Sequence, residues 1–364
     1  MIITELKYEN FRNLENNNIF PAKKMNVIIG DNGQGKTNLL ECIWMFNGVK
    51  SFRGAKDKEL IAFNKNKAIT EIKFFSENRN QSAKINYKNG KREVFINEIK
   101  KPAPSHLMGK ITSIVFSPDH LSLVKDGPSV RRKFIDSAIC QVKPRYSINL
   151  AKYNKILNQR NALLKDIAYH PDLQSTLEIW NEELAQSGSL IINERLKYIT
   201  QLSECAEKYH SGISEEKEKL QVVYKTHCQN GKSIFEIKDN FLYMLEKSQK
   251  DDLQLRYTTK GVHRDDIEIY INGKSARLFA SQGQQRSAVL SLKLAEATLV
   301  DEITGQQPVI LLDDVLSELD KDRQKFLLNK IKDRQVFITC CDYSDKNLMD
   351  DGIIFKMANG KISC

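Results

Sequence analysis

The N-terminal residues alternate between short apolar runs and turn-forming polar residues, which predicts strands rather than helices. One strand is expected over 2–7, a turn over 10–13, and a second strand over 25–29 that leads directly into a glycine-rich loop. Residues 37–46 then place apolar side chains three and four positions apart, as on one face of a helix. Strand, loop and helix therefore follow one another without a gap.

Further along the chain, the period of the apolar positions changes twice. Residues 68–97 alternate apolar and polar side chains around the hairpin turn Asn89-Gly90, and they predict an antiparallel sheet. From about residue 130 helical spacing takes over as far as 167. His170-Pro171-Asp172 interrupts it, and it resumes over 173–191. We expect two antiparallel helices, a short arm, whose apolar stripe serves packing.

The remainder of the chain alternates between the two kinds of element. Strands are expected at 220–224, 253–257, 267–271, 308–312 and 335–340, and helices at 233–247, 284–299 and 321–332. This alternation predicts an α/β fold.

Composition narrows the class of protein. At 364 residues, two domains or one domain with an insertion are expected. The net charge of +10 favours a polyanionic partner, because clustered Lys and Arg gain affinity by releasing phosphate counterions. A soluble Lys-rich protein without such a partner is the alternative. The seven scattered cysteines, together with the lack of a signal peptide and of a membrane-length apolar run, predict a cytoplasmic protein.

Candidate chemistry begins in the glycine-rich loop, which matches the P-loop pattern. Its residues are Gly30, Asp31, Asn32, Gly33, Gln34, Gly35, Lys36 and Thr37. Glycines let backbone N–H groups converge on phosphates at a helix N-terminus. We therefore expect Lys36 to reach the β- and γ-phosphates of ATP, and the Thr37 hydroxyl to ligate Mg²⁺.

Two acids at a strand end complete this candidate site. The strand at 308–312 is followed by Asp313, a buried carboxylate that needs a cation such as Mg²⁺ to offset its desolvation. Asp314 is placed to polarise the attacking water as a general base. A pair of surface acids is the alternative, which the loop upstream disfavours. Lys36, Asp313 and Asp314 are therefore the predicted catalytic residues, with Mg²⁺ on Asp313.

A third motif precedes the predicted helix at 284–299. The Ser281 hydroxyl and the Gly283 amide, followed by Gln284, form a second candidate anion site backed by the helix dipole. One polypeptide cannot easily wrap this site and its own P-loop around one γ-phosphate, so we expect a second subunit to deliver it. An ordinary serine cap with a glycine turn is the alternative.

These motifs resemble those of ABC-type ATPase heads in the SMC superfamily, and the residues between them are similar to the RecF family. The similar segments span nearly the whole chain and lie at 10–13, 116–119, 127–136, 261–266, 280–286 and 311–320. The resemblance implies an α/β fold: an ABC-type ATPase head with an attached antiparallel β subdomain and a short helical arm domain. The expected boundaries are 1–125 for the first part of the head, 126–250 for the arm and 251–364 for the second part of the head.

The resemblance also implies an activity. Asp313 would be the Walker B acid, Ser281 to Gln284 the signature, and 317–320 a loop along a dimer interface. Two heads would close around ATP and Mg²⁺ on duplex or gapped DNA, and weak, DNA-stimulated hydrolysis would act as a conformational switch. Such a protein works with RecO and RecR to load RecA at gaps coated by single-strand-binding protein, in DNA repair, replication and the SOS response.

The chain departs from the pattern of ABC heads at three positions. Thr339 stands where a switch histidine is usual, and Asp314 replaces a glutamate, which is consistent with slow hydrolysis. Asp126 stands where the family's motif has a glycine. The interval between Thr37 and Ser281 is also too short for the long coiled coil of related proteins.

Contacts with DNA are less specific in the sequence. Residues 50–101 are rich in Lys and Arg and would suit a phosphate-facing surface. The basic run 131–133 would touch DNA or pair with Asp119 or Asp136. The charged segment His263 to Asp266 would organise the nucleotide or the arm interface.

Two other classes of protein remain open. One is an SMC-like ATPase-nuclease of the overcoming-lysogenization-defect type, which needs a further acidic metal cluster. The other is an architectural DNA-binding protein with vestigial ATP chemistry.

Overall fold

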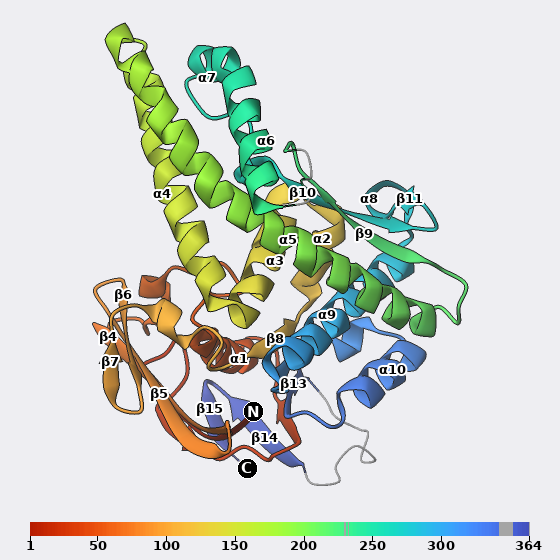
Figure 1. Cartoon of the computed structure of the whole chain (residues 1–364). Helices are drawn as coiled ribbons and strands as arrows, with labels where there is room; N and C mark the ends of the chain where they lie inside the picture. Colours follow the sequence, from red (N-terminus) through yellow and green to blue (C-terminus); the bar gives the residue numbers. More distant parts are fainter. Residues whose placement is uncertain (229–230, 232, 342–351, 364) are drawn as a thin grey trace. The chain divides into compact units, whose positions relative to one another are not determined.

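The computed structural model describes all residues except 229–230, 232, 342–351 and 364 (Figure 1). The described chain forms two compact units, here called the head unit and the arm unit. The head unit contains Met1–Leu121, Lys208–Glu218 and Ser281–Cys364, and the arm unit contains Ser122–Glu207 and Lys219–Ala280.

The division into units differs from the predicted boundaries at three places. Residues 122–125, predicted as head, lie in the arm unit, and residues 208–218, predicted as arm, lie in the head unit. Residues 251–280, predicted as part of the head, lie in the arm unit. The reason is a buried contact: Asp252 and Thr258 both accept hydrogen bonds from Arg160 of the arm, at 2.8 and 2.7 Å.

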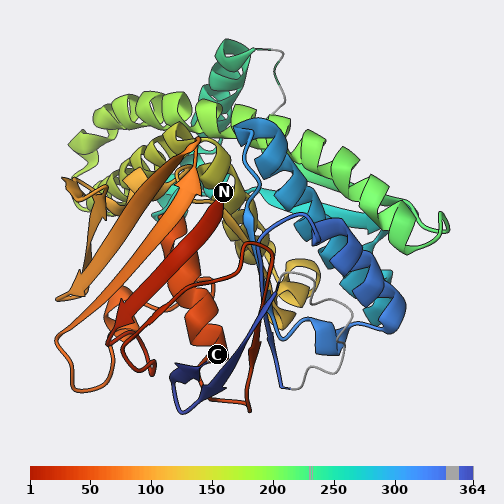
Figure 2. The same ribbon diagram turned by 90° about the horizontal axis from the view of Figure 1, so that it is seen from below.

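An antiparallel sheet with strand order β2-β1-β4-β5-β6-β7 forms one layer of the head unit (Figure 2). Its strands are β1 (Ile2–Glu9), β2 (Asn17–Ile19), β4 (Lys67–Ser76), β5 (Arg79–Lys88), β6 (Lys91–Ile96) and β7 (Ile99–Lys101). Asn89 and Gly90, with φ of 54° and 68°, form the predicted hairpin turn between β5 and β6. The predicted antiparallel sheet is therefore confirmed.

The second head sheet has the order β15-β14-β3-β13-β12-β8 and is parallel except for β15. Its strands are β3 (Met25–Ile29), β8 (Ser113–Phe116), β12 (Val309–Asp313), β13 (Val336–Cys340), β14 (Ile353–Ala358) and β15 (Lys361–Ser363). Strand β12 is buried throughout and β13 at every residue except Cys340, which explains their continuous apolar runs.

Three helices of the head unit carry its motifs. They are α1 (Lys36–Trp44), α9 (Gln282–Thr304) and α10 (Lys321–Ile331). Leu39, Leu40 and Ile43 of α1 share one apolar core with residues of both sheets, among them Ile72 and Leu311. This core fixes α1, and with it the end of the P-loop, against the two sheets.

The arm unit consists mainly of helices. They are α2 (Ser122–Lys125), α3 (Pro128–Val142), α4 (Pro144–Asp166), α5 (Leu177–Ile213), α6 (Ile234–Lys247), α7 (Gln249–Leu255) and α8 (Ala276–Phe279). Figure 1 shows α4 and α5 side by side as the predicted antiparallel pair, and Lys152 pairs with Glu183 across them at 2.9 Å. The end of α5, from residue 208, belongs to the head unit.

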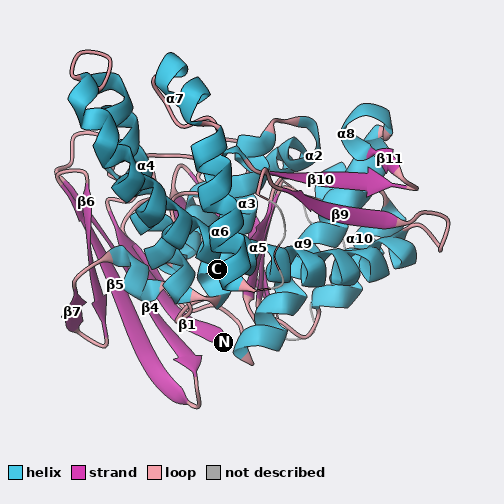
Figure 3. Cartoon of the chain, turned by 45° about the horizontal axis from the view of Figure 1, so that its top comes forward, coloured by secondary structure: helices cyan, strands magenta, loops and turns pink. Residues whose placement is uncertain are grey.

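A small sheet completes the arm unit. It consists of β9 (Leu220–Lys225), β10 (Asp266–Ile271) and β11 (Lys274–Ser275), in the order β11-β10-β9 (Figure 3).

One predicted strand is wrong. Residues 253–257 were expected to be extended, but 249–255 form α7, and Arg256 ends this helix with φ of 59°. The alternation of leucines around residue 254 suggested a strand, whereas the position of the segment depends on the buried pair of Asp252 with Arg160.

Candidate functional site

The P-loop lies between β3 and α1, in the order of elements that its chemistry requires. Gly35 is the N-cap of α1 and has φ of 110°, a conformation that only glycine adopts without strain. A Cβ on Gly30 would lie 2.2 Å from the carbonyl oxygen of Met357 on β14. Position 30 therefore has no room for any side chain.

The tip and the end of the loop differ in their surroundings. Asp31, Asn32 and Gly33 are exposed. Gln34, by contrast, is anchored, because its carbonyl oxygen accepts a hydrogen bond from the Gly360 amide at 2.9 Å and its side chain accepts one from the Asn359 amide. The turn between β14 and β15 thus holds the end of the loop through two hydrogen bonds.

Lys36 and Thr37 begin α1, and each has a defined partner. The buried Lys36 ammonium donates to the carbonyl oxygens of Gly30 and Asp31, at 2.6 and 3.2 Å. The Thr37 hydroxyl donates to Asp313 Oδ1 at 2.8 Å, although the two residues are 276 positions apart. The structure therefore brings the P-loop and the predicted acid Asp313 together.

Asp313 ends β12, and two threonines bond its carboxylate. Besides Thr37, the Thr339 hydroxyl on β13 contacts Oδ1 at 3.1 Å. Burial raises the pKa of the Asp313 carboxyl, and the two hydroxyl hydrogen bonds oppose that shift. A divalent cation would offset the same desolvation, and the hard oxygens of Thr37 and Asp313 are donors that Mg²⁺ prefers.

Asp314 follows with φ of 50°, a left-handed conformation that aspartate tolerates better than most residues. Its backbone N–H donates to the Thr339 hydroxyl at 3.0 Å. Thr339 is fully buried, and its hydroxyl therefore holds both acids in place from the neighbouring strand β13. This bracing role was not predicted from the sequence, which only compared Thr339 with a switch histidine.

The predicted signature residues cap α9. The Ser281 hydroxyl accepts a hydrogen bond from the backbone N–H of Gln284 at 3.3 Å. In return, the backbone N–H of Ser281 donates to the side-chain Oε1 of Gln284 at 2.8 Å. These reciprocal bonds form a capping box. Gly283 lies in the first turn, where backbone N–H groups have no intrahelical acceptor. The N-terminus of α9 therefore presents donors that suit an anion.

Arg323 of α10 links the signature to the segment after Asp314. Its guanidinium donates to the Ser287 hydroxyl at 2.9 Å and lies 3.5 Å from the Gly283 carbonyl oxygen, and it also pairs with Asp320. Arg286 pairs with Glu318 at 2.7 Å in the same region. The predicted interface loop 317–320 is therefore attached to α9 by two arginines.

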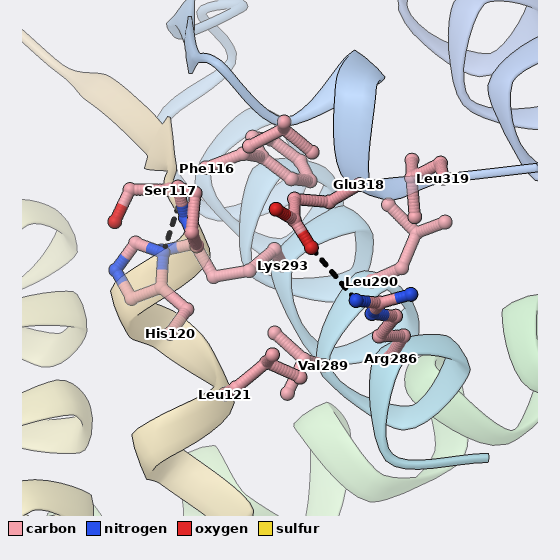
Figure 4. Close-up of a pocket in the computed structure, with 12 residues that line it drawn as sticks. Phe116, Ser117, His120, Leu121, Arg286, Val289, Leu290, Lys293, Glu318 and Leu319 are labelled. Carbon is pink, nitrogen blue, oxygen red and sulfur yellow. Dashed lines mark hydrogen bonds and ion pairs between the residues drawn. The ribbon is translucent and has the colours of Figure 1, made fainter. Parts of the chain in front are cut away.

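A cavity lies between this loop, α9 and the end of β8 (Figure 4). Its lining is mostly apolar and includes Phe116, Val289 and Leu319. Figure 4 shows the Arg286–Glu318 pair beside it and His120 on the opposite wall.

The charged segment from His263 to Asp266 belongs to the arm unit. Buried Asp265 accepts from Tyr224 and lies 3.3 Å from Arg195, while Asp266 pairs with Arg131 at 2.8 Å. His263 contacts the Tyr153 hydroxyl at 2.9 Å. The segment therefore joins arm elements to one another.

The basic run at 131–133 is mostly committed within the protein. Arg131 is buried on Asp266 rather than on the predicted Asp119 or Asp136, and Arg132 donates to the Asp265 carbonyl oxygen at 2.6 Å. Asp136 pairs with Arg195 instead. Because these guanidiniums bind protein groups, they are poor candidates for DNA contacts.

The basic stretch at 50–101 is mixed in charge once it is folded. Lys73 pairs with Glu5 at 2.8 Å, Lys100 with Glu93 at 2.5 Å, and Arg92 with Asp57 at 3.0 Å. The side chains of Lys73 and Lys100 are more than half exposed, so these two pairs contribute little to stability, and both lysines can exchange their carboxylate partners for phosphates.

Two other kinds of feature are not found among the described residues. Across the described part of the chain, there is no group of three or more His, Cys, Asp or Glu residues arranged to hold a metal ion. Within the same residues, every helix is too short or too polar to cross a bilayer.

Comparison with known proteins agrees with this architecture. The family model for the RecF/RecN/SMC N-terminal domain matches residues 2–363. A head domain of SMC from Pyrococcus furiosus matches with a TM-score of 0.54 at 16% identity, over 99% of this chain and 95% of that one. At this identity the likeness concerns the fold alone. The chain is an ABC-type ATPase head of the SMC kind.

More similar relatives define the family within this class. The DNA replication and repair protein RecF of Ruminiclostridium cellulolyticum is 44% identical over the full length of both chains, and that of Clostridium perfringens is 40% identical over the same extent. The structure of a recombination mediator protein RecF with ATP, in the RecFOR pathway, matches with a TM-score of 0.93 at 36% identity, over 100% of this chain and 97% of that chain. The chain belongs to the RecF family.

Proposed function

We propose that this protein is a cytoplasmic recombination mediator that binds ATP and Mg²⁺ and dimerises on DNA. The observation that carries the proposal is the hydrogen bond between Thr37 and Asp313, because it places a P-loop hydroxyl and an acid at one point. The solved relative with ATP supports the choice of nucleotide.

The residues have the following proposed roles. The loop from Gly30 to Thr37 cradles the phosphates through its amides and Lys36, and Thr37 and Asp313 hold Mg²⁺. When bound, this ion would neutralise charge on the β- and γ-phosphates. Asp314 accepts the proton of the attacking water, and the Thr339 hydroxyl keeps its backbone in place.

The signature is proposed to act in trans. Ser281, Gly283 and Gln284 of one subunit would contact the γ-phosphate held by the P-loop of the other subunit. The N-terminus of α9 supports this role, because its first-turn amides and the Ser281 hydroxyl proton can donate to an anion. ATP then joins two heads, and its weak, DNA-stimulated hydrolysis releases them.

The biological partners follow from the family. We propose that the dimer binds duplex or gapped DNA without sequence specificity, and that the net charge of +10 contributes to this affinity. RecO and RecR would act with it to load RecA at gaps coated by single-strand-binding protein, in repair, replication and the SOS response.

Sedimentation with ATP, ADP or no nucleotide tests this proposal, with and without a gapped duplex. Dimers are expected with ATP only. Ser281→Arg should bind nucleotide like the wild type but remain monomeric, because the arginine side chain fills the anion site. Dimers of normal strength from Ser281→Arg would contradict the role in trans.

A further inference from the structure

The side-chain amide of Gln284 has a partner at both ends. Its Oε1 accepts from the Ser281 amide at 2.8 Å, and its Nε2 donates to Glu218 Oε1 at 2.7 Å. The first bond belongs to the capping box of α9, whereas the second reaches a residue outside this helix. A change at Glu218 therefore leaves the Gln284 amide free to turn away from Ser281.

Glu218 is itself held in place. Its Oε2 lies 3.0 Å from Nε2 of His210, and its amide donates to the Ser214 hydroxyl at 3.3 Å. His210 is fully buried, and this burial lowers the pKa of its ring, against the opposing effect of Glu218. Because a carboxylate only accepts hydrogen bonds, the ring donates through Nε2.

The end of α5 that carries His210 is packed against the helices of the motif region. The Tyr209 hydroxyl bonds the Thr298 hydroxyl of α9 at 2.7 Å. A Cβ on Gly212 would lie 3.0 Å from the ring of Phe326 on α10, which indicates close packing there. Glu218 thus extends from a part of the head unit whose position is set by α9 and α10.

We propose that Glu218 is the positioning residue of the signature. It orients Gln284, Gln284 retains the Ser281 amide, and the Ser281 hydroxyl and Gly283 amide then stay directed outward for a phosphate. This inference rests on the proposed ATP-dependent dimerisation. The contact in trans then depends on Glu218, a residue outside the signature itself.

Removing Glu218 could in principle strengthen dimerisation instead of weakening it. A carboxylate near a helix N-terminus would oppose the approach of a phosphate if its charge were uncompensated. In that case, removing Glu218 would strengthen dimerisation. We expect weakening instead, because Gln284 and His210 both donate to this carboxylate.

The test measures the ATP concentration that gives half-maximal dimerisation, by sedimentation of the full chain. Glu218→Met keeps the size of the side chain but cannot accept the Gln284 bond, and it should raise this concentration about tenfold. Glu218→Gln retains an acceptor and should stay within about threefold of the wild type. Nucleotide affinity of the monomers should be unchanged in both, because the P-loop is untouched.

A double-mutant cycle shows whether Glu218 acts through Gln284. Gln284→Ala should weaken dimerisation, and Glu218→Met should add nothing in that background. Glu204→Ala is the matched control, because it removes a carboxylate from an exposed position on α5. Additive effects in the cycle would overturn the inference. So would a Glu218→Met protein that dimerises like Glu204→Ala. A wild type that fails to dimerise with ATP would instead refute the proposed function.

Discussion

At the scale of single residues, the candidate site depends on side chains that its motifs do not contain. Thr339 is the clearest example, since its one hydroxyl contacts Asp313 at 3.1 Å and the Asp314 amide at 3.0 Å. The sequence gives no direct sign of this role, because the residue lies on another strand, 25 positions from Asp314.

Thr339→Val should therefore slow ATP hydrolysis while preserving the fold. Valine has the same shape but leaves the Asp314 amide without an acceptor and Asp313 with one hydroxyl fewer. We expect hydrolysis to fall about tenfold, a value typical of losing one hydrogen bond to a charged group. Phosphate release measures this loss, and Thr339→Ser, which keeps the hydroxyl, is the control. Equal rates in the valine and serine proteins would contradict the bracing role.

Two glycines of the P-loop should differ in their tolerance of alanine. Gly33 has φ of 79° and open space around it, so Gly33→Ala should cost only about 1 kcal/mol of stability. Gly30→Ala places a methyl group 2.2 Å from the Met357 carbonyl oxygen, and β14 must move to accept it. We expect a cost of roughly 3 kcal/mol, typical of overpacking. Denaturant unfolding of both proteins compares them, and equal losses would disprove the close approach of β14.

At the scale of elements, local patterns predict the motif-bearing segments well. The strand at 25–29, the helix that follows it and the helix after Ser281 are confirmed, because each has a strong period and a clear cap or loop. The strands β8, β14 and β15 were not predicted. Strands β8 and β15 have only four and three residues, and β8 and β14 pair with strands that come from distant parts of the sequence.

The error at α7 has a related cause. Its place depends on Asp252, which bonds Arg160 across 92 positions, and no local pattern reveals such a pair. The contact of Glu218 with Gln284 was missed for the same reason. Motifs identify the residues proposed to bind the nucleotide, whereas supporting side chains become visible only when distant segments are placed together.

The stability of the folded protein should depend on pH in two opposing ways, because burial shifts the pKa values of two groups in the arm unit in opposite directions. Burial raises the pKa of Asp265 to about 6 and lowers the pKa of His263 to about 4. The stability that Asp265 contributes to the folded state is fully present below its unfolded pKa of about 4, and it is lost as the pH rises through 6. The stability that His263 contributes is present above its unfolded pKa of about 6.5, and it is lost as the pH falls through 4.

Replacing either group should therefore tilt the curve of unfolding free energy against pH. Between pH 4 and 6.5, Asp265→Asn should make stability rise more steeply with pH than in the wild type, and His263→Gln should make it rise less steeply. Each difference should be roughly 1 to 3 kcal/mol across this interval. Denaturant titrations at several pH values give the slopes. Parallel curves for wild type and both variants would show that neither group titrates as described.

At the scale of the whole molecule, the P-loop and the signature of the head unit have separate supports. The P-loop is held by β14, by Asp313 and by the apolar core around α1. The signature is held by Glu218 and Arg323. The proposed mechanism combines the P-loop of one molecule with the signature of another, and ATP joins the two in trans.

Mixing two defective proteins tests whether ATP joins two molecules in trans. Lys36→Ala lacks phosphate binding but keeps its signature, and Ser281→Arg has the reverse defect. With ATP, each protein alone should remain monomeric, whereas the mixture should form a heterodimer that contains one intact composite site. Sedimentation with one protein fluorescently labelled would detect that species. Dimers of either protein alone, or a mixture that stays monomeric while the wild type dimerises, would contradict dimerisation in trans.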